Sequence, residues 1–232
     1  MLTLRRSEDR GHVDHGWLNA RHSFSFGGYH DPDNMGFRVL RVINEDVIAA
    51  GMGFGTHPHR DMEILTYVIE GALEHKDNMG NGSVIRPDTV QWMSAGTGVQ
   101  HSEFNPSQVE PTHLLQIWIL PDRQGRRPDY AEKNFPAADR RDQLRLVASG
   151  DGADGSICWG QDVRLYASLM SAGKGAALDL AAGRHAWVQV VRGALDINGE
   201  TLGRGDGAAV SDESRLEIQA TQDSEFLVFD LP

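Results

Sequence analysis

Short runs of β-branched and aromatic residues, separated by turn residues, recur along the whole chain. Glycine, asparagine, aspartate and proline stand between the runs, and the 26 glycines supply many turns. The clearest runs cover residues 37–54, 63–75, 113–120, 163–170, 185–197 and 225–231. Short strands at even spacing are typical of sandwiches and barrels, whereas helical periodicity is weak throughout. The pattern therefore predicts an all-β fold.

One strand-and-turn unit occurs twice. EILTYVIEGALEHKD at 63–77 resembles HAWVQVVRGALDING at 185–199, with Gly71 and Gly193 separated by a constant offset of 122 residues. Each copy continues through a turn into another glycine-containing strand. Residues 121–145 between the copies are polar, charged and proline-containing, as inter-domain segments are. We predict an N-terminal barrel at residues 1–125, a polar linker at 126–145 and a C-terminal barrel at 146–232.

Two His-containing pairs frame the first copy of this unit. His57 and His59 precede its strand, and His101 and Glu103 follow the segment WMSAGTGVQ. Residues two apart on a strand point to the same face, so two such pairs on neighbouring strands can direct four side chains at one point. Three imidazoles and a carboxylate suit Fe, Mn, Co, Ni, Cu or Zn. We predict one divalent metal ion here.

Two other side chains compete for a place in this site. Glu63 shares the parity of His57 and His59, and is therefore a rival fourth ligand or a neighbour of the ligands. His75 is a less favoured candidate, because the GALEH segment moves away from the site. In the second copy, the offset of 122 places Asp179, Ala181 and His185 at the positions of His57, His59 and Glu63. The C-terminal barrel is therefore expected to lack metal ligands.

Composition narrows the classes of partner. The formal net charge is −11, which disfavours nucleic acid and anionic membranes as partners because both require a positive surface. The start of the chain, MLTLRRSEDRGH, has no apolar core of a signal peptide, and no apolar run is long enough to span a membrane. Cys158 is the single cysteine, which fits a reducing cytoplasm, and we expect it to be buried.

Several blocks together resemble one protein family. GFGTHPHRDMEILTYVIEG and GTGVQHSEFN resemble the two cupin motifs, which line small jelly-roll barrels. HGWLNARHSFSFGGYHDPDNMGFRVLRVINED, VQWMSAGTGVQHSEFN and HLLQIWILP narrow the resemblance to the pirin family of bicupins. The resemblance is close over about the first 120 residues, whereas the second half matches mainly in the arrangement of its strands and turns.

The resemblance carries expectations about fold, ligands and activity. It implies a bicupin of two antiparallel jelly-roll β-barrels packed together, with a mononuclear metal, most often Fe(II), in the first. It assigns the ligands to His57, His59, His101 and Glu103, and leaves Glu63 beside them.

Bacterial relatives imply a quercetin 2,3-dioxygenase, in which a metal-bound flavonol reacts with O2 and releases CO. Glu103 would then be both ligand and base. The alternative is a metal-containing regulator or sensor that binds a protein partner, as mammalian pirin does.

Overall fold

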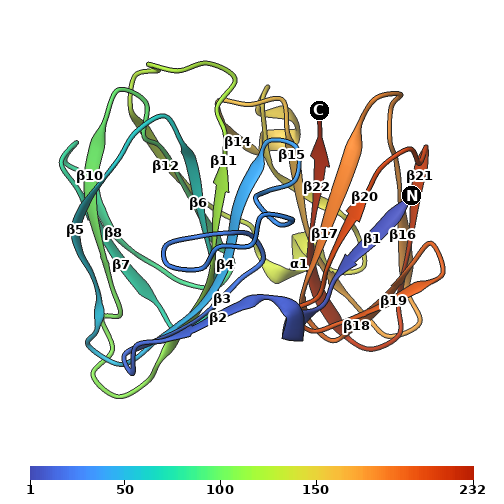
Figure 1. The fold of residues 1–232 in the computed structure, drawn as a ribbon, viewed down its shortest axis with the longest axis horizontal. Helices are drawn as coiled ribbons and strands as arrows, with labels where there is room; N and C mark the ends of the chain where they lie inside the picture. Colours follow the sequence, from blue (N-terminus) through green and yellow to red (C-terminus); the bar gives the residue numbers. More distant parts are fainter. The chain divides into compact units, whose positions relative to one another are not determined.

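The computed structural model describes every residue from Met1 to Pro232 and confirms the all-β bicupin prediction (Figure 1). The only α-helix is the single turn α1 (Ala137–Arg140), and 3-10 turns cover Ser7–Asp9 and Ala153–Gly155. The chain divides into two compact units. We call Gly11–Asn134 with Trp159–Gln161 the first barrel. Met1–Arg10, Phe135–Cys158 and Asp162–Pro232 form the second barrel.

The first barrel consists of a seven-stranded and a four-stranded antiparallel sheet. The larger sheet has the order β12-β9-β6-β11-β4-β3-β2, and the smaller has the order β5-β10-β7-β8. The strands are β2 (Gly11–Asp14), β3 (Leu18–His22), β4 (Leu40–Ile48), β5 (Gly53–His59), β6 (Glu63–Glu70), β7 (Leu73–Asp77), β8 (Gly82–Ile85), β9 (Thr89–Ser94), β10 (Val99–Phe104), β11 (Thr112–Ile119) and β12 (Asp129–Asn134).

The second barrel repeats this plan, except that β14 pairs with β13 in parallel. Its larger sheet has the order β1-β20-β17-β22-β15-β13-β14, and its smaller sheet has the order β16-β21-β18-β19. The strands are β1 (Leu2–Arg5), β13 (Arg145–Ser149), β14 (Ile157–Cys158), β15 (Arg164–Met170), β16 (Gly175–Asp179), β17 (His185–Arg192), β18 (Ala194–Ile197), β19 (Glu200–Gly203), β20 (Gly207–Val210), β21 (Arg215–Ala220) and β22 (Ser224–Leu231). Position by position, the strand orders of the two barrels correspond, as the internal repeat predicts.

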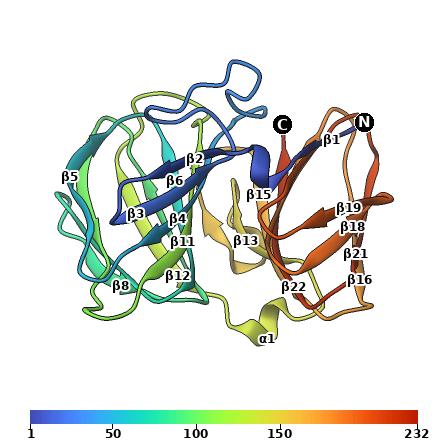
Figure 2. The same cartoon turned by 60° about the horizontal axis from the view of Figure 1, so that its bottom comes forward.

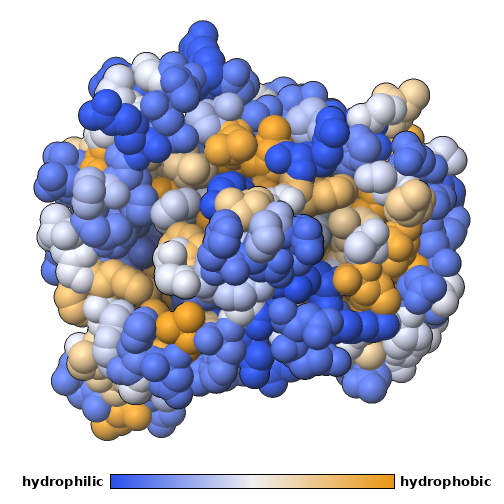
Figure 3. Space-filling view, viewed as in Figure 1, coloured by the Kyte–Doolittle hydropathy of each residue, from blue (hydrophilic) through white to orange (hydrophobic).

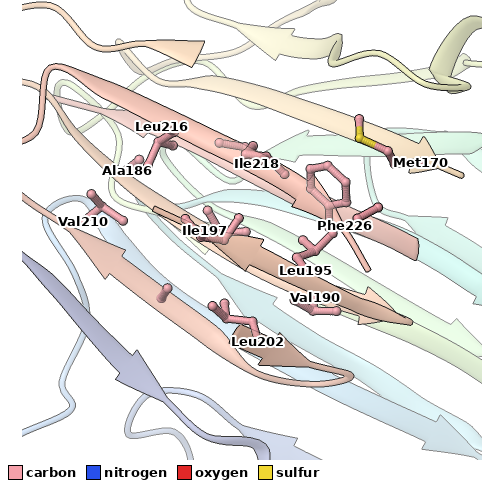
Figure 4. Close-up of a cluster of buried hydrophobic side chains, with 14 of the residues drawn as sticks. Met170, Ala186, Val190, Leu195, Ile197, Leu202, Val210, Leu216, Ile218 and Phe226 are labelled. Atoms are coloured by element: carbon pink, nitrogen blue, oxygen red, sulfur yellow. The ribbon is translucent and has the colours of Figure 1, made fainter. Parts of the chain in front are cut away.

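Hydrocarbon fills the second barrel. Its core joins the inner faces of both sheets, and the side chains drawn in Figure 4 contain only carbon and one sulfur. The first barrel has two smaller apolar clusters, one around Ile48, Val68 and Leu114 and one around Ile64 and Met93. The first barrel also buries a set of polar side chains that includes Asp46, Thr66, His75, Gln91, His101 and Glu103. On the molecular face in Figure 3, hydrophilic side chains dominate and apolar ones lie in small groups.

The structural units differ from the boundaries that the sequence suggests. The first strand, β1, pairs with β20 and completes the larger sheet of the second barrel. In Figure 2 it is the blue strand among the orange and red strands of that barrel. Residues 126–145 are not simply a linker, because β12 pairs with β9 at the edge of the first barrel. β1 and β12 each form hydrogen bonds to backbone groups of β20 and β9 that would otherwise be unpaired at the edge of a sheet. A polar surface strand such as DYAEKN carries little apolar pattern, so composition alone suggests a linker.

The exposure of Cys158 also differs from the expectation drawn from the sequence. Cys158 is exposed rather than buried, and its thiol donates a hydrogen bond to the Gly150 carbonyl oxygen at 3.4 Å. No helix in the structure has both the length and the apolar character needed to cross a membrane.

Candidate metal centre

Strands β5 and β10 lie side by side and carry the two predicted pairs of ligands. His101 lies opposite His57 in the antiparallel register, and Glu103 lies opposite Phe54. The strands approach closely at Gly53, where a side chain would collide with the backbone of Glu103 and Phe104. Glycine is therefore required at position 53, because it lets the backbones of β5 and β10 approach each other closely.

A β-bulge sets the direction of the first two histidines. The register between β5 and β10 shifts between His101 and Glu103, so Gly55 and Thr56 occupy the space of one residue. An extra residue in one strand bends it and re-aims the side chains that follow. In the second barrel, β16 pairs with β21 without a shift, and Leu178 lies opposite Leu216.

Because of the bulge, the alignment of the two halves with a constant offset of 122 is wrong at His57. Before the bulge, the offset of 122 holds, but after it His57 corresponds to the inward Leu178 rather than to Asp179. Asp179 keeps 78% of its side chain exposed and pairs with Arg215 on the outside. The inward positions of β16 and β21 are apolar, so the second barrel offers no equivalent of the histidine cluster.

Three imidazoles converge inside the first barrel. The nitrogen ligand atoms of His57, His59 and His101 lie within 4.8 Å of one another. Their ring centroids are 4.5 Å apart for His57 and His101, and 4.8 Å apart for the other two pairs. A second group within the same distance combines His101 with His75 and Glu103. His101 thus belongs to both groups.

The hydrogen bonds of these rings leave lone pairs directed at the centre. Nδ1 of His57 lies 2.8 Å from the Gly55 carbonyl oxygen, which can only accept, so Nδ1 carries the proton and Nε2 is free to bind a metal. Nε2 of His101 is buried and has no hydrogen-bond partner. Buried polar atoms are almost always paired. An orphan imidazole nitrogen among two further imidazoles and a carboxylate fits a divalent transition metal.

The surroundings of His101 and His59 favour the uncharged form of these two rings. Burial, reinforced by His57, His59 and His75, lowers the pKa of His101 to about 2. Burial and the neighbouring His57 lower the pKa of His59 to about 4. Neutral imidazole is the form that binds metal ions, so near neutral pH no proton has to leave either ring before metal binds.

Glu103 is a buried carboxylate held by one amide. Nε2 of Gln116 donates to both of its oxygens, at 2.9 and 3.2 Å, and Thr66 donates to Gln116 in turn at 3.3 Å. One oxygen of Glu103 lies 4.0 Å from Nε2 of His101. Burial raises the pKa of Glu103, although the bond from Gln116 opposes this shift. The site therefore contains a carboxylate more basic than one in water.

Glu63, the rival ligand, does not reach this centre. Its carboxylate accepts hydrogen bonds from Trp92 at 2.7 Å, from Ser94 at 2.8 Å and from the Gly160 backbone at 3.3 Å. A side chain at Gly160 would lie 2.7 Å from Oε1 of Glu63, so the segment Trp159–Gln161 needs glycine to dock there. Glu63 thus anchors this segment to the first barrel.

Two polar residues near the centre were missed or undervalued in the sequence. His75 is fully buried on β7, where it lies opposite Glu103 in register, and belongs to the second candidate group. Asp46 on β4 is 5% exposed, and its pKa is raised to about 7 by burial, by Glu103 and by Glu45. In the sequence, the only sign of a role for Asp46 is that it is a charged residue inside an apolar strand.

A pocket of about 500 Å³ adjoins the cluster at His59. This volume is in the range of small-molecule sites. It is lined by Pro58, His59, Arg60, Asn78, Gly98, Val99 and Gln100.

Comparisons with known proteins find related sequences that match the whole length of the chain. The family model described as Pirin matches residues 3–119, and that of a quercetinase C-terminal cupin domain matches residues 146–231. The quercetin 2,3-dioxygenase of Escherichia coli K12 is 50% identical over 232 residues, which is 100% of this chain and 99% of the relative.

Two crystal structures of Escherichia coli YhhW match as closely. One has 50% identity and a TM-score of 0.97, and the match covers 100% of this chain and 98% of that one. The other, of the bacterial pirin YhhW in complex with nickel(II), has 49% identity and a TM-score of 0.96, covering 100% and 99%.

Proposed function

The chain belongs to the pirin family, and we propose that it is a metal-dependent dioxygenase that opens a flavonol such as quercetin with O2 and releases CO. His57, His59, His101 and Glu103 would hold one divalent ion, with Fe(II) as the expected metal. The observation that carries this proposal is the convergence of three imidazoles, with Nε2 of His101 buried and unpaired, next to Glu103. A related pirin forms a complex with nickel(II), which supports a divalent ion here.

A bound divalent ion would act as a Lewis acid that lowers the pKa of the flavonol 3-hydroxyl and leaves positions open for substrate. The protein supplies the base. Glu103 is buried, its pKa is raised, and it can take the hydroxyl proton on the oxygen that faces His101. Gln116 holds that carboxylate in place through both oxygens.

The adjacent pocket would hold the aromatic body of the substrate. Its volume of about 500 Å³ is in the range of drug-sized ligands, and His59 contributes to both the pocket and the imidazole cluster. Arg60, Asn78 and Gln100 line it and offer hydrogen bonds to the phenolic hydroxyls of a flavonol.

The test is turnover with defined metal content. Protein reconstituted with Fe(II), or with another divalent ion, should bind one metal per chain, consume quercetin and O2, and release CO in equal amounts. Glu103→Ala and His101→Ala should lower kcat/KM at least about a hundredfold, which corresponds to about 2.7 kcal/mol of transition-state stabilisation. Asp179→Ala, an exposed position on β16, is the matched control and should remain fully active.

The outcomes separate the competing functions. Full activity in both site variants would overturn the assignment. Tight quercetin binding without CO release would instead favour the alternative, a metal-containing regulatory or sensor protein that binds a protein partner.

A further inference from the structure

A chain of polar groups leads from the surface turn after β7 to the histidine cluster. Oδ2 of Asp77 lies 3.4 Å from Nε2 of His75, and Nδ1 of His75 lies 3.4 Å from Nδ1 of His101. The two histidine side chains are both 1% exposed. The register of β7 and β10 produces this contact, because His101 lies opposite Asp77 and Glu103 lies opposite His75.

The Asp77 carboxylate fixes the direction of both hydrogen bonds in this series of polar groups. Asp77 also accepts bonds from the backbone of Met79 and from both the backbone and side chain of Asn81, at 2.8–2.9 Å. Because it is an acceptor, Nε2 of His75 must carry a proton, which leaves Nδ1 of His75 as an acceptor. Nδ1 of His101 must then donate, and its Nε2 keeps a lone pair.

The orientation of the His75 ring is fixed independently. The ring of Tyr130 is stacked on it with centroids 5.1 Å apart and an interplanar angle of 25°. The Tyr130 hydroxyl is held by Ser83 and Gln91 at 3.0 Å each. These contacts hold the plane of the His75 ring, and both of its nitrogens have hydrogen-bond partners.

We propose that Asp77 and His75 are positioning residues that hold His101 as the Nδ1–H tautomer and so present its Nε2 lone pair to the metal. Metal-binding histidines usually donate their other ring nitrogen to an acceptor, and loss of that acceptor weakens metal binding by about 10–100-fold. The distinctive feature here is that a second histidine relays the effect of the carboxylate. The inference rests on the proposed metal centre but not on the proposed substrate.

The first experiment reads the tautomer without any metal. Long-range ¹H–¹⁵N NMR of metal-free protein with labelled histidine should show the proton of His101 on Nδ1. In Asp77→Asn the amide NH2 can donate to Nε2 of His75, which reverses both bonds and shifts the proton of His101 to Nε2. A proton on Nε2 in the wild-type protein overturns the proposal, whether or not the protein binds metal or oxidises quercetin.

The second experiment measures Co(II) affinity by competition with a chromophoric chelator. His75→Phe keeps a ring against Tyr130 but removes the acceptor, and should weaken binding about 10–100-fold. Asp77→Asn should have a similar effect. Because both residues act through one chain, the double variant should bind no more weakly than the weaker single variant.

Two controls separate positioning from stability. Asn81→Ala removes one partner of Asp77 but leaves the contact with His75, and His113→Phe makes the same change at a His–Glu pair elsewhere in the barrel. Both should bind Co(II) like the wild type. Equal losses in the controls, or losses that follow the Tm of the metal-free protein, would show a merely structural role.

The Co(II) absorption spectrum tests the remaining alternative, in which His75 is itself a ligand. Under the proposal, saturated His75→Phe and Asp77→Asn keep the wild-type band positions. A change of coordination in His75→Phe alone would contradict the proposal.

Discussion

The two barrels share one strand order but enclose opposite chemistry. In the second barrel, Leu178 lies opposite Leu216, Ile197 opposite Ile218 and Val188 opposite Val228. At the corresponding places in the first barrel, His57 lies opposite His101, His75 opposite Glu103 and Thr66 opposite Gln116. Each of these polar pairs thus has an apolar counterpart at the same place in the fold.

The difference shows that the fold does not require the polar interior. Hydrocarbon at these positions gives a closed core in the second barrel, and apolar burial is the main stabilising contribution to folding. Buried polar groups cost free energy unless they are fully paired, and Nε2 of His101 is unpaired. The first barrel therefore carries groups that reduce its stability, and the proposed metal centre would account for their presence.

The largest expected effect comes from converting one pair into its counterpart. His57→Leu combined with His101→Leu should abolish metal binding, with affinity falling at least about a thousandfold, or about 4 kcal/mol. The metal-free variant should have an equal or higher Tm, because apolar groups replace the buried imidazole of His101 and the half-buried imidazole of His57. Metal titration and thermal unfolding measure the two effects.

The reverse exchange is the control for that experiment. Leu178→His with Leu216→His should lower the stability of the second barrel and create no metal site. The comparison would fail if the variant with leucine at 57 and 101 were unfolded while the variant with histidine at 178 and 216 kept its stability.

Deleting Thr56 should remove the β-bulge and give β5 the regular pairing of β16. His57 would stay opposite His101 and inward, as Leu178 stays opposite Leu216, because the deleted residue is the extra one. Only the bend that the bulge gives to β5 would be lost, so metal affinity should fall about thirtyfold, or about 2 kcal/mol, while the β-sheet circular dichroism spectrum is retained. A loss as complete as in the double leucine variant would contradict this alignment of the two barrels.

Asp46 should make the first barrel pH-sensitive. Its pKa is raised from 3.8 to about 7, mainly by burial and then by Glu103 and Glu45, so the folded state holds this proton more tightly than the unfolded state. The contribution of Asp46 to the unfolding free energy of the metal-free protein should therefore fall as pH rises from about 4 to 7.

Replacing the carboxyl group measures this effect. Asp46→Asn should be more stable than the wild type at pH 8 by about 2 kcal/mol, less than the full shift implies because the amide is also desolvated. Near pH 4 the two proteins should have similar stability. A difference that does not vary with pH would assign the effect to packing.

The smallest effect is expected at Gln116, which corresponds to Val228. Gln116→Val removes the hydrogen bonds to Glu103 and should raise the pKa of that carboxyl group further. We expect metal affinity to fall about tenfold, or about 1.4 kcal/mol, and the Tm to fall as well, because Glu103 and Thr66 lose their hydrogen bonds to Gln116. An unchanged affinity would mean that Glu103 is held by the barrel wall alone.

Local pattern was enough to predict the strands and the members of the histidine cluster. The spacing of His57 and His59, and of His101 and Glu103, puts each pair on one face of a strand. The roles of Glu63 and His75 depend on pairing between strands that are distant in sequence. Parity counted along the chain failed at Glu63, because a turn at residues 60–62, where Asp61 has a positive φ, separates β6 from His59.

The edges of the sheets were also beyond local pattern. β1 and β12 are short and partly polar, so neither resembles a buried strand. Their place is determined by open hydrogen-bonding edges at β20 and β9, which are formed by residues far away in sequence.

The pairing of β1 with β20 has a consequence for the order of assembly. Leu2 lies opposite Val210, so this strand pair closes one of the longest loops in the chain. Closing long loops costs entropy, and contacts of large sequence separation slow folding. During synthesis, the first strand to leave the ribosome waits until nearly the whole chain has followed. A fragment that begins at the second repeat would lack this strand and expose β20 as an edge open to association with other chains.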